Sequence, residues 1–168
     1  TPLTVINYIL LGGASGFTLA ALYAALAAPS QANFFAGWAF IITLLGLLGR
    51  STSLWRNAQL RPTSTLQTAI GIKHPHIVQK AQGAMGGSFN TREFFHGKSA
   101  SFLRTIKPAF LVLAFALPLL LLIIGLSRPS VWFLGSAFIL QYTGLLAERW
   151  FFFAEANHPQ NLYYQTIG

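Results

Sequence analysis

Cysteine is absent from this chain of 168 residues, and Asp and Glu together number only three. Without thiols, the chain has no disulfides, no thiolate metal sites and no cysteine-ligated iron–sulfur clusters. Charged residues of all kinds make up 8% of the chain, against about 25% in soluble domains. This composition lies outside the range of soluble globular domains.

Apolar residues are correspondingly abundant in this chain. They account for 54% of the sequence, and the mean hydropathy is +0.54. The first 49 residues carry no charged side chain. Long uncharged runs in such a background are typical of segments that cross a bilayer. We therefore predict an all-α, polytopic membrane protein.

Four membrane spans are predicted, at about residues 3–28, 34–55, 109–126 and 131–153. The first, 26 residues without charge, is long enough to cross about 30 Å of hydrocarbon with some tilt. The spans form two hairpins joined by a long basic segment, with residues 56–107 outside the membrane. The whole chain, 1–168, is interpreted as a single membrane-anchor domain.

Small residues recur every fourth position in the first span, at Gly12, Gly16, Ala20, Ala24 and Ala28. This spacing places them along one helix face, where another helix could approach closely. We predict a packing face here; the alternative is an Ala-rich helix without that role.

The basic segment from Arg50 to Lys107 holds nine of the eleven Lys and Arg residues, three of the four His and one acid, Glu93. Because these charges flank membrane spans, we interpret them as topology signals and not as a nucleic-acid surface. The positive-inside rule places the segment and both termini in the cytoplasm. The segment is close to the length limit of that rule, so the orientation stays open. Arg50 and Arg56 are expected to reach the membrane surface from the end of the second span.

Glu148 and Arg149 form the sharpest local feature, because an acid and a base within or near the hydrocarbon are costly. They are candidates for quinol binding or proton relay. The alternative places both at the membrane surface, held there by the aromatic residues Trp150–Phe153.

Other motifs give weak signals. His74 and His76 lack a third ligand and are expected to be solvated loop residues. His96 and His158 fall outside the predicted spans, so no haem is predicted. The glycine-rich residues 83–88 do not match a nucleotide-binding loop. No metal site and no self-sufficient catalytic site is expected.

The chain starts with Thr1-Pro2 and enters the first apolar run directly. No basic region or cleavage site precedes that run, so it is not interpreted as a signal peptide. Two explanations stay open: a fragment, or the trimmed remainder of a longer chain.

Two stretches resemble the dimethyl sulfoxide reductase anchor subunit family. One runs from residues 66–72 through 86–95, and the other is 147–156. The resemblance covers the chain as the C-terminal half of such an anchor. It implies a haem-free, non-catalytic subunit in the bacterial inner membrane. Its partners would be a molybdopterin catalytic subunit and an iron–sulfur subunit, to which it would pass electrons from menaquinol or ubiquinol.

The best-known quinol-linked residues of that family lie in the half that this chain lacks, so none is carried over. A purely structural docking module without a quinol site is the main alternative, and a small transporter has little support. The candidates for partner docking lie in the first stretch of the resemblance: Phe89, Asn90, Arg92, Glu93, Phe94 and Phe95.

Overall fold

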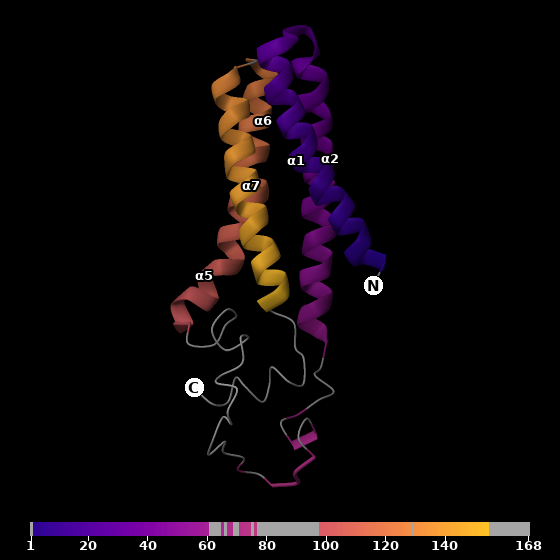
Figure 1. The fold of residues 1–168 in the computed structure, drawn as a ribbon, viewed down its shortest axis with the longest axis vertical. Coiled ribbons are helices and arrows are strands. Elements are labelled where there is room, and N and C mark those ends of the chain that lie inside the picture. The colour runs from indigo at the N-terminus through magenta and orange to yellow at the C-terminus, as the bar shows by residue number, and fades with distance from the viewer. Residues whose placement is uncertain are drawn as a thin grey trace, which may run out of the picture. The chain divides into compact units, whose positions relative to one another are not determined.

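The computed structural model describes residues 2–60, 65, 67, 68, 71–74, 76, 98–128 and 130–154. These residues contain helices and no strand. The helices are, in chain order, α1 (Pro2–Ala27), α2 (Pro29–Gln59), α5 (Ala100–Leu111), the π-helix η1 (Val112–Ala116), α6 (Leu117–Ser127) and α7 (Val131–Ala154). Figure 1 shows the two long hairpins, α1 with α2 and α6 with α7.

Four stretches are long and apolar enough to cross a membrane: Pro2–Ala27, Pro29–Gln59, Arg104–Ser127 and Val131–Ala154. The third combines the end of α5 with η1 and α6. The prediction of an all-helical chain with four membrane-spanning helices is therefore confirmed, and the chain is a multi-pass membrane protein.

The backbone divides into two compact units. The first comprises Thr1–Gln59 and Ile106–Arg149, and the second comprises Leu60–Thr105 and Trp150–Gly168. In the second unit, the rings of Phe102 and Trp150 meet edge to face with centroids 5.7 Å apart. The predicted single domain over 1–168 stays a prediction.

The first unit is a helix bundle whose buried positions follow a step of three and four residues. Along α2 the buried residues are Ala32, Ala36, Ala39, Thr43, Gly46, Arg50 and Ser53, and along α7 they include Leu134, Ala137, Gln141, Gly144 and Glu148. An average step of 3.5 keeps one stripe of each helix facing its neighbours over the full length. Many of these residues are Ala or Gly, which lets the backbones approach closely.

Gly144 is the described glycine at which an added Cβ would come closest to another helix. A Cβ atom added there would overlap the backbone nitrogen of Ala114 and come within 2.6 Å of the carbonyl carbon of Leu113. The backbone of α7 therefore rests directly on η1. Glycine is required at this position because any side chain would separate the two helices.

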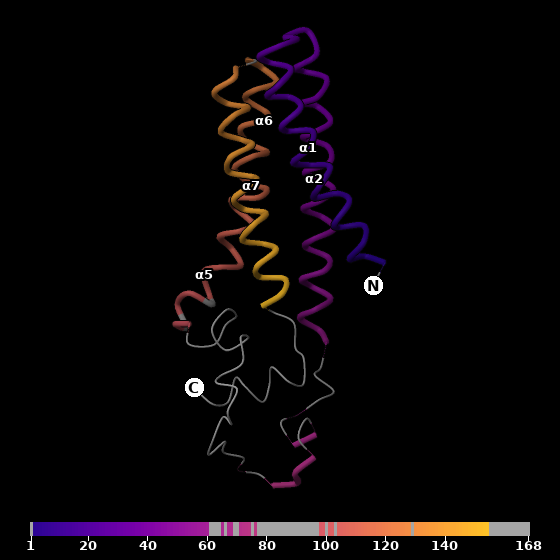
Figure 2. The backbone as a smooth tube through the Cα atoms, viewed as in Figure 1, coloured from indigo at the N-terminus to yellow at the C-terminus, as the bar shows by residue number. Residues whose placement is uncertain are grey.

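The π-helix η1 has a local cause. The N–H of Leu117 bonds to the carbonyl of Val112, five residues back. Pro118 follows at once, and proline has no N–H and clashes with the carbonyl four residues before it. A widened turn relieves this clash. The tube in Figure 2 shows that the chain continues through this turn into α6.

The structure differs from two predicted span boundaries, at residues 34 and 109, and from the predicted packing face. Residues 29–33 form the first turns of α2 and not a separate loop, because Pro29 suits a first helical position. Pro108 lies inside α5, which begins upstream at Ala100. Gly12 and Gly16 face outward, and an added Cβ would meet nothing within 4 Å at either. The packed stripe of α1 runs instead through Asn7, Leu11, Ala14, Thr18, Ala21 and Ala24, so of the predicted face Ala24 is buried in it.

Candidate functional site

The candidate site is a buried charged cluster formed by Glu148 of α7, Arg149 beside it and Arg50 of α2. Glu148 is fully buried and Arg50 is 2% exposed. Arg50 Nε lies 2.6 Å from Glu148 Oε1, and Arg149 Nε lies 2.5 Å from Glu148 Oε2. One carboxylate therefore bridges two guanidinium groups, with one oxygen for each.

Helix geometry explains the difference between the two arginines. Glu148 continues the buried stripe of α7, and Arg149, about 100° further around the helix, is one-quarter exposed. Arg50 lies on the buried stripe of α2, between Gly46 and Ser53. Arg50 therefore points into the bundle, and the expectation that it reaches the membrane surface is wrong.

Aromatic rings cover both guanidinium groups. Arg50 Cζ lies 5.8 Å from the centre of the Phe110 ring, and Phe110 is fully buried. Arg149 Cζ lies 4.2 Å from the centre of the Tyr8 ring, which is 44% exposed. Cation–π contacts of this kind strengthen when water is excluded. Tyr8 and Arg149 thus form the accessible edge of the cluster, and Glu148 with Arg50 forms its interior.

Asn7 and Ser53 add uncharged polar groups beside the cluster. The Asn7 amide donates to Ser53 Oγ at 2.7 Å and to the Gly49 carbonyl at 3.3 Å. Both side chains are buried. Their bonds join α1 to α2 at Gly49 and Ser53, the first of which directly precedes Arg50 in the sequence. A Cβ added at Gly49 would overlap Asn7 Oδ1, so the close contact depends on glycine.

A second buried polar group lies two helical turns away. Thr18 Oγ1 donates to Gln141 Oε1 at 2.7 Å, and Gln141 Nε2 donates to Thr43 Oγ1 at 2.9 Å. These three side chains are almost completely buried and join α1, α7 and α2. They carry no charge, so their role is to fix the helices against one another.

Two of the three charged residues, Glu148 and Arg149, were predicted as site candidates from the sequence. The structure places these two side chains together and shows an ion pair between them. Arg50 was missed as a site residue, as were Asn7, Ser53 and the Thr18–Gln141–Thr43 group. A signal was present: Thr43, Arg50 and Ser53 fall on the same heptad stripe as Ala36 and Ala39.

The remaining candidates lie elsewhere. His74 and His76 are exposed, and His74 Nδ1 is 2.7 Å from the His76 carbonyl oxygen in a local turn. Among the described residues, no group of three potential metal-ligating His, Cys, Asp or Glu side chains occurs. The glycine-rich residues 83–88, His96, His158 and the proposed docking residues fall outside the described residues: Phe89, Asn90, Arg92, Glu93, Phe94 and Phe95.

Comparison with known proteins found a clear similarity to a subunit of a sulfite dehydrogenase. Over 174 aligned positions the chain is 56% identical to a subunit of the sulfite dehydrogenase of Allochromatium vinosum. The alignment covers the whole chain and 52% of that relative, so the chain spans about half the length of the curated protein it matches. No protein-family model and no solved structure matches the chain. The relative's name refers to sulfite dehydrogenase, so membership of the dimethyl sulfoxide reductase anchor family stays an expectation.

Proposed function

We propose that this chain is a non-catalytic membrane subunit of an oxidoreductase complex that acts on sulfite. The whole-chain similarity to a sulfite dehydrogenase subunit supports this assignment. In this role the chain anchors catalytic subunits, with molybdopterin and iron–sulfur subunits as its proposed partners, in the bacterial inner membrane. The chain alone has no catalytic activity toward sulfite.

We further propose that the charged cluster exchanges electrons and protons with a membrane quinone. Oxidation of sulfite releases two electrons, and reduction of a quinone to its quinol consumes two electrons and two protons. In a sulfite-oxidising complex the quinone is therefore the acceptor, and menaquinone and ubiquinone are the candidates. This direction is opposite to the one implied by the resemblance to dimethyl sulfoxide reductase anchors.

The observation that carries this proposal is the buried carboxylate of Glu148 between two arginines inside a membrane bundle. Ionisable groups within membrane spans are rare and default to a functional role. The partly exposed edge formed by Arg149 and Tyr8 offers a guanidinium donor for a quinone oxygen. The Glu148 carboxylate, directly behind Arg149, would take up each of the two protons in turn and pass it to a quinone oxygen, returning each time to the ionised form that pairs with the arginines.

The test is Glu148→Gln in the assembled complex. A neutral amide keeps the shape but cannot transfer a proton, and proton transfer by a positioned side chain contributes about 10²–10⁴-fold. We expect quinone reduction to slow at least tenfold while the complex still co-purifies intact. Thr143→Val, an exposed change on the same helix, serves as the matched control. Wild-type quinone kinetics in Glu148→Gln would refute the quinone role.

One observation also favours the structural alternative. A carboxylate that bridges arginines of α2 and α7 is also what a purely structural ion pair would form. Titration with a fluorescent quinol analogue separates the two functions. The quinone site predicts saturable binding that weakens in Arg149→Gln, whereas a structural anchor predicts no saturable binding in either protein.

A further inference from the structure

The interior of the bundle is ordered in alternating polar and apolar layers. The charged layer contains Glu148, Arg50 and Arg149, with Asn7 and Ser53 beside it. The next layer is apolar, formed by Leu11, Ala114 and Phe115 with Leu47, Leu111 and Leu145 packed against them. The uncharged Thr18–Gln141–Thr43 layer follows. The last layer is apolar again and contains Ala21, Ala36, Ala39, Leu122, Leu134 and Ala137.

Helix numbering gives the spacing of these layers. Seven residues separate Thr43 from Arg50 and Gln141 from Glu148, which corresponds to about 10 Å along each helix. The intervening layer is apolar and buried. Leu11 and Phe115 both lie close to Gly46 of α2, and a Cβ added there would meet each of them at 3.5 Å, an ordinary van der Waals contact. Leu11, Ala114 and Phe115 are each at most 5% exposed.

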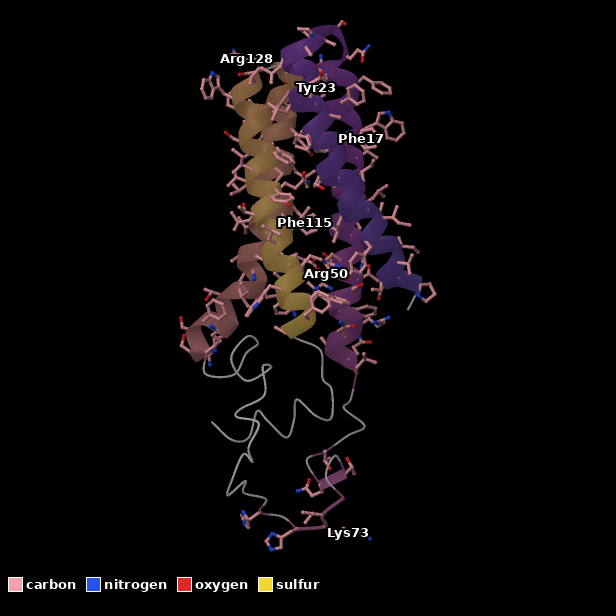
Figure 3. The ribbon with its side chains drawn as sticks, viewed as in Figure 1. Phe17, Tyr23, Arg50, Lys73, Phe115 and Arg128 are labelled. Carbon is pink, nitrogen blue, oxygen red and sulfur yellow. The ribbon has the colours of Figure 1, made fainter. Side chains whose placement is uncertain are left out.

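The two ends of the bundle differ accordingly. Figure 1 shows that the chain reverses between α1 and α2 and between α6 and α7 at the same end of the bundle, here called the turn end. At the opposite end, here called the Gln59 end, α2 ends at Gln59, and Arg149 lies in the last turns of α7. In Figure 3, Arg128 lies at the turn end, Arg50 lies toward the Gln59 end, and Phe115 lies between them. The charged layer is therefore next to the Gln59 end, and two apolar layers separate it from the turn end.

From this order we infer that Glu148 exchanges protons with one side of the membrane only, the side of the Gln59 end. A proton needs a chain of water or of titratable side chains to move. Buried apolar layers interrupt such a chain, because they offer water no hydrogen-bond partners. The Thr18–Gln141–Thr43 layer does not bypass the block, because its groups are uncharged and bonded to one another. Arg149, one-quarter exposed, marks the accessible route.

This inference deepens the proposed function, because the direction of proton uptake matters only if Glu148 serves a quinone. Every proton that Glu148 hands to the quinone is then drawn from the compartment at the Gln59 end. The bundle does not carry protons from one side to the other. The one-sided access itself holds for either function and can be measured without a quinone.

Cysteine accessibility is a direct test, since the chain contains no native cysteine. Single variants would be placed in sealed vesicles of known orientation and treated with a membrane-impermeant, sulfonate-bearing thiosulfonate from each side. Ser53→Cys, a nearly isosteric change, reports on the charged layer, and Thr43→Cys reports on the inner polar layer. Ser30→Cys, exposed at the turn end, shows that the reagent reaches that end.

We expect Ser53→Cys to react from the Gln59 side only, Ser30→Cys from the opposite side only, and Thr43→Cys at least tenfold more slowly than either, from both sides. Reaction of Ser53→Cys from the turn side, or its failure to react from either side, would overturn the inference. Rapid reaction of Thr43→Cys from either side would do the same.

A second variant set tests which layer forms the block. Phe115→Ala in the Thr43→Cys background should let the reagent reach Thr43→Cys from the Gln59 side. The matched control is Val112→Ala, exposed in the same π-helix, which should leave Thr43→Cys protected. Equal protection in both variants would show that Phe115 does not form the block. Wild-type quinone kinetics in Glu148→Gln would remove the proposed function and leave the labelling pattern unaffected, so the two failures are distinguishable.

Discussion

Arg50 of α2 and Glu148 of α7 form an ion pair whose two side chains are almost completely buried, with Nε and Oε1 2.6 Å apart. Arg50→Met keeps most of the side-chain volume but leaves Glu148 with Arg149 alone. Removing one partner of a buried pair costs about 3–5 kcal/mol. We expect a loss of this size in the free energy of unfolding, measured by reversible denaturation in mixed micelles.

The double variant Arg50→Met, Glu148→Leu should recover part of that loss, because it removes the buried carboxylate as well. Arg149→Met, at a one-quarter exposed position, should cost clearly less than Arg50→Met. A double variant as unstable as the sum of its single variants would show that the two residues do not interact.

Gly144→Ala tests the close approach of α7 to η1. The new methyl group would overlap the Ala114 backbone, and overpacking typically costs about 1–3 kcal/mol. Gly16→Ala adds the same atoms where nothing lies within 4 Å and should be neutral or slightly stabilising, since Ala favours helix over Gly. Thermal unfolding of the purified variants gives the comparison, and equal melting temperatures would contradict it.

Gly49→Ala tests the contact between α1 and α2. Its methyl group would displace the Asn7 carboxamide and break the bond to Ser53. We expect destabilisation by about 1–3 kcal/mol from this clash. Asn7→Ala introduced with it should restore part of the stability, because the smaller side chain makes room. A purely additive double-mutant cycle would argue against the contact.

Gln141→Leu removes the uncharged polar layer while keeping a side chain of similar size. The Thr43 hydroxyl loses its donor, and the Thr18 hydroxyl keeps the Ala14 carbonyl at 2.8 Å. Hydrogen bonds between membrane helices average about 0.6 kcal/mol and reach about 1.7 kcal/mol, so we expect a loss in this range. Thr143→Val, whose hydroxyl bonds only within its own helix among the described residues, should change stability less. A larger effect of Thr143→Val would contradict this interpretation.

The helical architecture could be predicted from the sequence because uncharged apolar runs of this length have one stable form in a bilayer. Which face of α1 packs could not. Gly12 and Gly16 have the spacing of a packing motif, yet Asn7 and Thr18 find hydrogen-bond partners on the other side of the helix and determine which face is buried. The packed face of α1 therefore depends on partners that are distant in the sequence, and the local spacing of small residues does not reveal those partners.

The candidate site was only partly predictable, again because its members lie on different helices. Glu148 and Arg149 stand out as charges beside an apolar run. Arg50 opens a basic segment and looks like a topology signal, and only its pairing with a glutamate on another helix shows that it is buried. The π-helix was not predicted: Pro118 indicates a kink but does not determine how the helix relieves the clash.

That π-helix has a consequence for how the chain tolerates changes in length. A π turn holds one residue more than an α turn, so η1 is equivalent to a one-residue insertion in the third span. Deletion of the exposed Ala116 should convert it to a regular α turn and leave the same faces buried on both sides. Deletion of Leu120, equally outward-facing in α6, would rotate the residues that follow by about 100° and turn buried Leu122 away from the bundle. We expect the first deletion to fold, as measured by monodisperse detergent-solubilised protein, and the second to aggregate.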